Sequence, residues 1–196
     1  MSSLWSPAER SRFLRRRSTA AFQRAHRAEC AILYRWLAHV EARTVVDVGC
    51  GDGRLFHLWT AIGSSALGVD ADPAMLVRAR TRAQTTATID VVHGVVPEFQ
   101  IPSADVACCI RLLGRLDEPS AHELIAQMIG AAPTTVIQAI IDEGCQATAV
   151  EAEGRLRLDD RQRLVAVIQE RGGGVECARR VLPGSPSWLF LIRRRD

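Results

Sequence analysis

The chain has 196 residues, with 25 basic and 22 acidic side chains and a formal net charge of +3. Hydrophobic residues make up 47% and charged residues 24%, which is ordinary for a globular domain and excludes disordered and collagen-like classes. Every basic residue is arginine, which excludes mechanisms that need a lysine.

The first 43 residues differ in charge from the rest of the chain. They contain nine arginines against Glu9, Glu29 and Glu41, a local balance of +6. Apolar residues recur at helical spacing from position 28 to position 40, which predicts an amphipathic helix packed on the remaining fold. The arginines at 15–17 precede that helix, and we interpret them as a solvated end. We therefore expect a basic helical extension or lid over residues 1–43 and one globular domain over residues 44–196.

From residue 44 onward, short apolar runs alternate with helical patterns. The expected strands span residues 44–48, 66–69, 89–92, 106–110, 135–141, 175–182 and 188–192. Four helices are expected. The first follows the first strand, and the second begins at Asp72 and Pro73. The third runs from a capping box at Ser120–Glu123 to near Gly130, and the fourth spans residues 159–171. This alternation predicts a Rossmann-like doubly wound α/β fold with a mostly parallel sheet. A short Pro-Gly-Ser-Pro turn makes the last two strands an antiparallel hairpin.

The strongest functional signal is a glycine-rich turn after the first expected strand, where residues 45–53 read VVDVGCGDG. Gly49, Gly51 and Gly53 remove side chains where a ligand must approach the backbone. Asp70 ends the second expected strand, and a carboxylate there can accept both hydrogen bonds of a ribose diol. The turn and the acid together predict an adenosine-like ligand. The alternative is a structural turn with an aspartate cap.

The charge around this turn selects among adenosine ligands. A pyrophosphate-binding fingerprint needs a third glycine where this chain has Arg54. Asp47, Asp52 and Asp70 add negative charge, which repels a diphosphate and suits a ligand that carries an ammonium and a sulfonium group. We therefore expect S-adenosylmethionine as the cofactor. The six cysteines lack zinc-binding spacings, and we expect no metal site and a reduced, cytoplasmic protein.

These residues resemble the class I S-adenosylmethionine-dependent methyltransferase family. Residues 45–55 look like its first motif, residues 67–76 like its second, and residues 104–113 like its fourth-strand segment. The resemblance runs from about residue 28 to the end of the chain and implies a seven-stranded sheet whose final strand is antiparallel.

The resemblance also implies roles for individual residues. The expected cofactor-binding set is Asp47, Gly49, Cys50, Gly51, Gly53, Asp70, Ala71, Met75, Gly94, Val95 and Ile110. Asp47 and Gly49 are expected at the methionine moiety, and Asp70 at the ribose. Where the family often has an Asp or Asn that reads the adenine, this chain has His93-Gly-Val-Val96, so we expect backbone and apolar contacts there.

The expected acceptor is a small molecule, because motifs for base, glutamine, ribose and catechol methylation are absent from the sequence. Arg111, Tyr34 and His26 are the candidate catalytic residues. Arg111 can bind a carboxylate or phosphate on the acceptor, or it can form a structural salt bridge with Asp117 or Glu118. Tyr34 and His26 can equally be ordinary helix residues. We expect residues 142–158 to form the loop that selects the acceptor.

Two other functions stay open at this point. The fold can use S-adenosylmethionine for intramolecular cyclisation that releases methylthioadenosine, or the chain can be a non-catalytic or RNA-associated module that keeps the pocket. We do not expect nucleic acid as the partner, because the arginines at 10–17 have one aromatic neighbour and no stacking platform. No membrane association is expected, and the sequence does not determine an oligomeric state.

Overall fold

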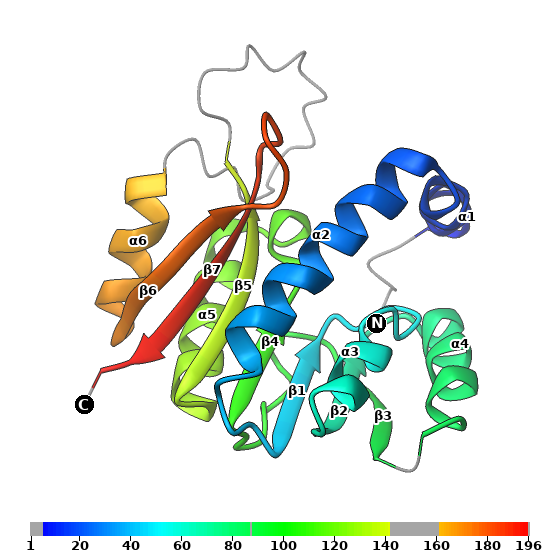
Figure 1. Ribbon diagram of the computed structural model, residues 1–196, viewed down its shortest axis with the longest axis horizontal. Helices are drawn as coiled ribbons and strands as arrows, with labels where there is room; N and C mark the ends of the chain where they lie inside the picture. The colour runs from blue at the N-terminus through cyan, green and yellow to red at the C-terminus, as the bar shows by residue number, and fades with distance from the viewer. Residues whose placement is uncertain (1–5, 87, 142–160, 196) are drawn as a thin grey trace.

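The computed structural model describes residues 6–86, 88–141 and 161–195. Within these ranges, seven strands form one sheet in the order β3-β2-β1-β4-β5-β7-β6 (Figure 1). The strands are β1 (Thr44–Val48), β2 (Ser65–Asp70), β3 (Ile89–His93), β4 (Val106–Cys109), β5 (Thr134–Ile140), β6 (Gly173–Arg180) and β7 (Ser187–Arg194). The predicted doubly wound sheet is confirmed.

The register places three strand ends side by side. Strand β1 pairs in parallel with both β2 and β4, so that Val48 lies opposite Val69 on one side and Cys109 on the other. The strand order reverses between β1 and β4, which is where ligands bind on such sheets. Strand β7 pairs antiparallel with both β5 and β6, and this confirms the predicted C-terminal hairpin.

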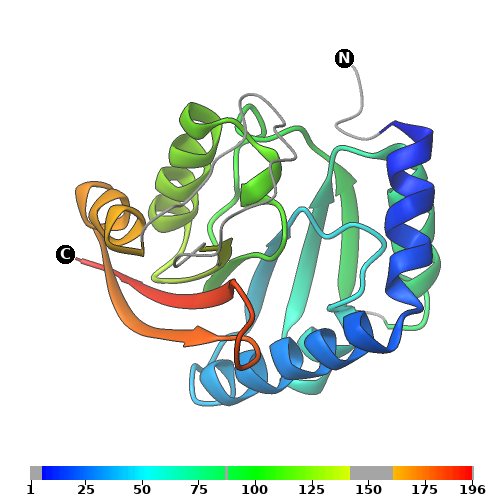
Figure 2. The same cartoon turned by 90° about the horizontal axis from the view of Figure 1, so that it is seen from above.

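Helices cover both faces of the sheet (Figures 1 and 2). On one face α2 (Ala20–Leu37), α3 (Phe56–Ala61) and α4 (Pro73–Ala83) pack into a common hydrophobic cluster with the sheet. On the other face α5 (Glu118–Ala131) and α6 (Arg161–Glu170) do the same. A single turn of 3-10 helix, η1 (Leu113–Arg115), lies between β4 and α5. None of the described helices has both the length and the apolar character needed to cross a bilayer.

The N-terminal arginines lie in a second helix that the sequence reading missed. Helix α1 (Pro7–Arg17) begins with a capping box in which Ser6 and Glu9 satisfy each other's backbone N–H groups. Its apolar residues are too few for an amphipathic pattern, and none of its side chains is fully buried. The interpretation of Arg17 as part of a solvated end is wrong, because this side chain forms an ion pair with Asp52.

One predicted helix start is also wrong. Helix α5 begins at Glu118 and not at the capping box that starts with Ser120, because the side chain of Asp117 accepts the backbone N–H of Ser120 and acts as the N-cap. Pro119 in the first turn supports the earlier start. The start of α4 is as predicted, with Asp72 as its N-cap. The expected acceptor loop, residues 142–158, lies outside the described residues.

Candidate cofactor and acceptor site

A pocket opens at the carboxyl ends of β1, β2 and β4, where the strand order reverses. Its walls come from the turn after β1, the end of β2, the segment after β4 and the helices α1 and α4. The lining residues are Phe13, Gly49, Cys50, Gly51, Asp52, Arg54, Asp70, Met75, Ile110, Arg111, Leu112 and Arg115. Segments that are distant in the sequence therefore meet at one pocket.

The glycine turn has the left-handed backbone that glycine permits. Gly49, Gly51 and Gly53 have φ angles of +72°, +60° and +75°. A Cβ on Gly49 would lie 2.8 Å from Cδ2 of Leu112, so this glycine is required by packing as well as by its φ angle. A Cβ on Gly51 would meet no protein atom within 4 Å. Gly51 therefore presents a bare backbone to open space in the pocket.

Asp70 links β2 to this turn. Its Oδ2 accepts the Gly51 N–H at 2.8 Å, and its Oδ1 accepts the Asp72 N–H at 2.8 Å. Burial raises the pKa of Asp70, and the two N–H groups oppose that rise because they stabilise the charged carboxylate. The carboxylate is thus held in one position at the floor of the turn.

The negative charge around the turn is largely balanced by arginines, which the sequence did not reveal. Asp52 forms ion pairs with Arg17 of α1 and with Arg82 of α4, the latter at 3.1 Å. Asp47 is 2% exposed, and burial raises its pKa to about 6 although it accepts a hydrogen bond from Trp59 Nε1. Asp70 lines the pocket without a cationic partner among the described residues, so it is the main negative charge there that would repel a diphosphate.

A buried carboxylate on α2 organises the other side of the site. Glu29 is fully buried, and its Oε1 accepts hydrogen bonds from Nε and Nη2 of Arg111 at 3.0 and 2.7 Å. The same carboxylate accepts bonds from Arg54 at 3.0 Å and from Gln138 at 2.8 Å. Burial alone would raise the pKa of Glu29, but the two guanidinium groups hold it below its ordinary value.

Arg111 thus has a structural partner, but not the one expected. Glu29 takes the place of Asp117 and Glu118, because Asp117 caps α5 and Glu118 pairs with Arg163 on the protein surface. Arg111 also has a φ of 68°, a strained value for a residue with a side chain, and its guanidinium lies 4.2 Å from the ring centre of Phe22. Such strain at a pocket wall is typical of functional positions.

Comparisons with known proteins agree with this geometry. A family model described as a methyltransferase domain matches residues 45–132. The structure of mitomycin 7-O-methyltransferase matches with a TM-score of 0.75 and 20% identity, over 98% of this chain and 61% of that chain. Magnesium protoporphyrin IX methyltransferase from Synechocystis PCC 6803, with bound S-adenosylhomocysteine, gives a TM-score of 0.75 and 14% identity, over 96% of this chain and 95% of that chain. The family-model match and these structural neighbours support a class I S-adenosylmethionine-dependent methyltransferase.

The chain also has curated relatives in sequence. The mitochondrial ubiquinone biosynthesis O-methyltransferase of Schizosaccharomyces pombe is 29% identical over 82 residues, which are 39% of this chain and 30% of that relative. The chain thus spans less than a third of that relative's length. The family uses S-adenosylmethionine, and solved neighbours hold this cofactor or its demethylated product.

The residues of this pocket fit the cofactor. The open space at Gly51 is a cradle that a side chain would fill, and Asp70 beside it offers carboxylate oxygens for ribose hydroxyls. Arg54 lines the same pocket, and its Nη2 is buried without a hydrogen-bond partner among the described residues. A buried donor without a partner is costly, and the carboxylate of a methionine moiety would satisfy it.

The structure brings about half of the expected site residues to the pocket. Those that line it are Gly49, Cys50, Gly51, Asp70, Met75, Ile110 and Arg111. The described pocket wall does not include Asp47, Gly53, Ala71, Gly94, Val95, His26 and Tyr34. Gly53 instead allows the Phe56 ring to pack against the turn, and Gly94 allows Phe99 and Val69 to approach, so both glycines serve packing.

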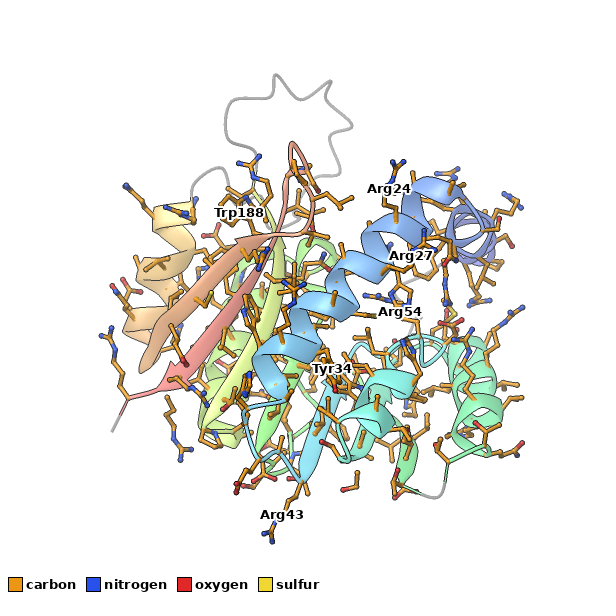
Figure 3. The ribbon with its side chains drawn as sticks, in the orientation of Figure 1. Arg24, Arg27, Tyr34, Arg43, Arg54 and Trp188 are labelled. Carbon is orange, nitrogen blue, oxygen red and sulfur yellow. The ribbon has the colours of Figure 1, made fainter. Side chains whose placement is uncertain are left out.

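The two catalytic candidates on α2 lie away from the pocket wall. Tyr34 is 48% exposed on α2 (Figure 3). His26 accepts a hydrogen bond from Arg54 at 2.8 Å, and burial together with that guanidinium lowers its pKa to about 4. Neither side chain is therefore among the described residues that line this pocket, and their catalytic role stays a prediction.

Five lining residues were not selected from the sequence as binding residues: Phe13, Asp52, Arg54, Leu112 and Arg115. Asp52 and Arg54 lie inside the glycine motif, so their place in the turn was a usable signal. Nothing in the sequence indicated that Phe13 lines the pocket, because this residue reaches it only through the position of α1, which lies over α4 (Figure 2).

Proposed function

We propose that this methyltransferase transfers the methyl group of S-adenosylmethionine to a small-molecule acceptor, by in-line displacement and without a metal ion. The observation that carries the proposal is the pocket where β1, β2 and β4 end. It contains the expected cofactor residues Gly51 and Asp70 together with Arg111, which follows β4. The family match supports the chemistry, and the pocket lining supports the assignment of residues.

The chain's own residues would hold and orient the cofactor. Asp70 accepts hydrogen bonds and is already positioned by the turn, while Gly51 leaves the space that a nucleoside needs. Arg54 Nη2 would take the methionine carboxylate. Bound S-adenosylmethionine supplies an electrophilic methyl carbon on a positively charged sulfur. Because that carbon is already activated, alignment of the acceptor is the main task left to the protein.

Several features support a compact acceptor with an anionic group. Phe13 of α1 forms part of the wall, and Arg10 ties α1 to Asp72 at 2.7 Å, so the N-terminal helix narrows the approach to the pocket. Arg111 and Arg115 line the pocket and provide cationic groups suited to a carboxylate or phosphate. The named structural neighbours that act on mitomycin and magnesium protoporphyrin IX are small-molecule enzymes, which is consistent with this class.

A labelling experiment tests the acceptor class. The purified chain is incubated with methyl-labelled S-adenosylmethionine and a cell extract, and the extract is then separated into low-molecular-mass, protein and nucleic-acid fractions. We expect label in the low-molecular-mass fraction and S-adenosylhomocysteine as the by-product. Label in protein or RNA would overturn the small-molecule assignment, and methylthioadenosine as the by-product would favour cyclisation.

Replacement of Asp70 tests the cofactor site. Asp70→Ala removes charged hydrogen bonds worth roughly 1.5–3 kcal/mol each, so we expect affinity for S-adenosylhomocysteine to fall at least tenfold in calorimetry. Asp90→Ala is the matched control, because Asp90 is an exposed aspartate on the neighbouring strand β3. Equal affinity of Asp70→Ala and the unmodified chain would remove Asp70 from the site.

A further inference from the structure

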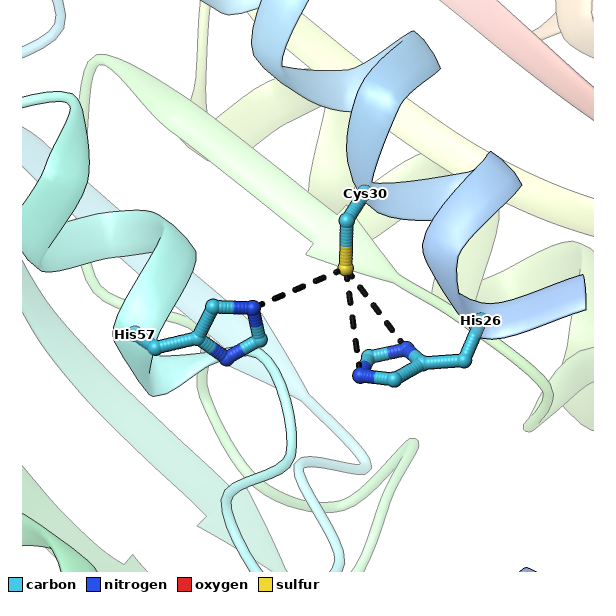
Figure 4. Close-up of side chains that lie close together, drawn as sticks. All are labelled: His26, Cys30 and His57. Carbon is cyan, nitrogen blue, oxygen red and sulfur yellow. Dashed lines mark hydrogen bonds between the residues drawn. The ribbon is translucent and has the colours of Figure 1, made fainter. Parts of the chain in front are cut away.

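Three metal-binding side chains converge outside the cofactor pocket (Figure 4). His26 and Cys30 are four residues apart on α2 and therefore share one face of that helix, while His57 comes from the first turn of α3. Each offers one ligand atom, and these three atoms all lie within 4.8 Å of one another. His26 and Cys30 are half-buried and His57 is exposed, so the cluster is reachable from solvent.

The distances match those between ligands of a tetrahedral metal ion. With Zn–S bonds of about 2.3 Å and Zn–N bonds of about 2.0 Å, sulfur and nitrogen ligands of a tetrahedron lie about 3.5 Å apart. Cys30 Sγ lies 3.8 Å from His57 Nε2, and 3.6 and 3.9 Å from Nδ1 and Nε2 of His26. Small side-chain rotations would bring all three donors to one ion.

We propose that His26, Cys30 and His57 bind a zinc ion. Two imidazoles and a thiolate are donors that Zn²⁺ prefers, and three protein ligands leave a fourth position for water. The ion would connect α2 to α3, and its binding free energy would add to the stability of the folded chain. This proposal departs from our expectation that the chain has no metal site. The cluster could not be predicted from the sequence, because His57 lies 27 residues from Cys30.

A carboxylate that could orient His26 as a metal ligand already lies next to the cluster. A metal-bound histidine commonly donates its other ring N–H to a carboxylate. Glu29 Oε2 lies 3.9 Å from His26 Nδ1. In this structure His26 Nδ1 accepts a hydrogen bond from Arg54 Nη1 at 2.8 Å. If Nε2 binds zinc, the ring proton moves to Nδ1, and the Nδ1 contact passes from Arg54 to Glu29. Arg54 keeps its own bond to Glu29 at 3.0 Å.

Two other roles for the cluster fit less well. A nucleophilic cysteine must face a substrate, but Cys30 does not line the pocket at the strand ends. Edge-to-face packing of the two imidazoles, whose ring centres are 5.8 Å apart, accounts for the histidines. It gives no reason for a sulfur atom within 4 Å of a nitrogen of each ring.

The test uses the full chain, free of tags and treated with a chelator. Zn²⁺ is titrated in by calorimetry, and Co²⁺ is added separately as a spectroscopic probe. We expect saturation at one zinc ion per chain, a higher melting temperature with zinc, and a cobalt spectrum with a thiolate charge-transfer band and tetrahedral d–d bands.

Variants locate the binding site. Cys30→Ser and His57→Gln should each lower zinc affinity at least about tenfold and abolish the stabilisation by zinc. His57→Gln is decisive because this exposed residue can be changed without disturbing the core. Cys177→Ser and the exposed His39→Ala are matched controls and should bind zinc normally. No saturable zinc binding, or unchanged affinity in His57→Gln, would overturn the proposal.

Discussion

Two glycines with similar backbone angles allow effects on ligand binding to be separated from effects on the stability of the fold. Gly51 has a φ of +60° and Gly63 a φ of +78°, and at both positions a Cβ would meet no protein atom within 4 Å. Only Gly51 lines the pocket. The same substitution therefore costs similar backbone strain at both sites but introduces a methyl group into the ligand's space at one of them.

We expect Gly51→Ala and Gly63→Ala to lose similar stability, about 1 kcal/mol each in urea denaturation, because both force alanine into a left-handed conformation. Affinity for S-adenosylhomocysteine should fall at least tenfold in Gly51→Ala alone. If both variants bind the cofactor like the unmodified chain, the cradle at Gly51 does not receive it.

Asp47 is a residue whose charge opposes folding. Burial raises its folded-state pKa to about 6, against an ordinary value of 3.8. A carboxyl group with a raised pKa favours the folded state most below the ordinary value, and this contribution is lost as the pH rises through about 6. Above that pH, folding holds a buried anion with one hydrogen bond from Trp59.

We therefore expect Asp47→Asn to stabilise the chain at pH 8 by about 3 kcal/mol, since each pKa unit corresponds to about 1.4 kcal/mol and the amide oxygen can still accept from Trp59. The gain should shrink below pH 6 and vanish near pH 4. Asp105→Asn is a control of opposite sign, because backbone hydrogen bonds from Thr44 lower the pKa of Asp105. A pH-independent gain in Asp47→Asn would contradict this assignment.

Among the elements, α1 has the weakest attachment that can be tested. It buries no side chain completely, and it contacts the domain through ion pairs from Arg10 to Asp72 and from Arg17 to Asp52, and through Phe13 against Phe22. Ion pairs are weakened by salt, whereas a buried apolar face is not. Helix α2, by contrast, buries Ile32, Leu33 and Leu37 against the sheet.

We expect the double variant Arg10→Ala, Arg17→Ala to speed hydrogen exchange of the amides of α1 severalfold while leaving those of α2 unchanged. High salt should have the same effect on the unmodified chain. Arg12→Ala with Arg16→Ala is the matched control, since it removes two charges from exposed positions on the same helix. Equal exchange in the two double variants would mean that the ion pairs do not hold α1.

At the scale of the whole molecule, Glu29 joins segments that are far apart in the chain. It connects α2 to the turn after β1 through Arg54, to the end of β4 through Arg111 and to β5 through Gln138. Removal of this one carboxylate leaves the buried guanidinium of Arg54 and the partly buried guanidinium of Arg111 without their carboxylate partner. Breaking a buried pair in this way is strongly destabilising.

We expect Glu29→Gln to lower the free energy of unfolding by about 3 kcal/mol or more at neutral pH, measured in urea. Because the folded-state pKa of Glu29 is lowered, its contribution is present above the ordinary value of 4.5 and is lost as the pH falls further. The difference from the unmodified chain should therefore shrink at acid pH. The exposed Glu41→Gln serves as the control, and equal stability of the two variants would argue against the network.

The fold was predictable to a large extent because its signals are local. The strands followed from short β-branched and apolar runs, and the turn at Gly49–Gly53 from its glycines. The predicted bounds differ from the observed ones by one or two residues at most strands. Helix α1 was missed because it has almost no apolar pattern, and the start of α5 was misplaced because two capping residues, Asp117 and Ser120, lie three residues apart.

The site was only partly predictable. Gly51 and Asp70 were predicted to lie together because a motif places them at the ends of adjacent parallel strands, and both line the pocket. The partner of Arg111 was not found, since Glu29 lies 82 residues away on a helix whose angle to the sheet no local pattern encodes. Residues with a motif but no open space, such as Gly53 and Gly94, turned out to serve packing.

Hydrophobic periodicity and turn chemistry act over a few neighbouring residues, so local patterns were enough to predict the doubly wound sheet, its antiparallel final strand and the glycine turn with its acid. The pairing of charges, in contrast, is set by the packing of the folded chain. The chain has 25 arginines and 22 acids, and nothing in their order pairs Arg17 with Asp52 or Glu29 with Arg54 and Arg111. Ion pairs and ligand clusters depend on distances of a few ångströms between distant segments, and those distances arise only when the helices pack on the sheet.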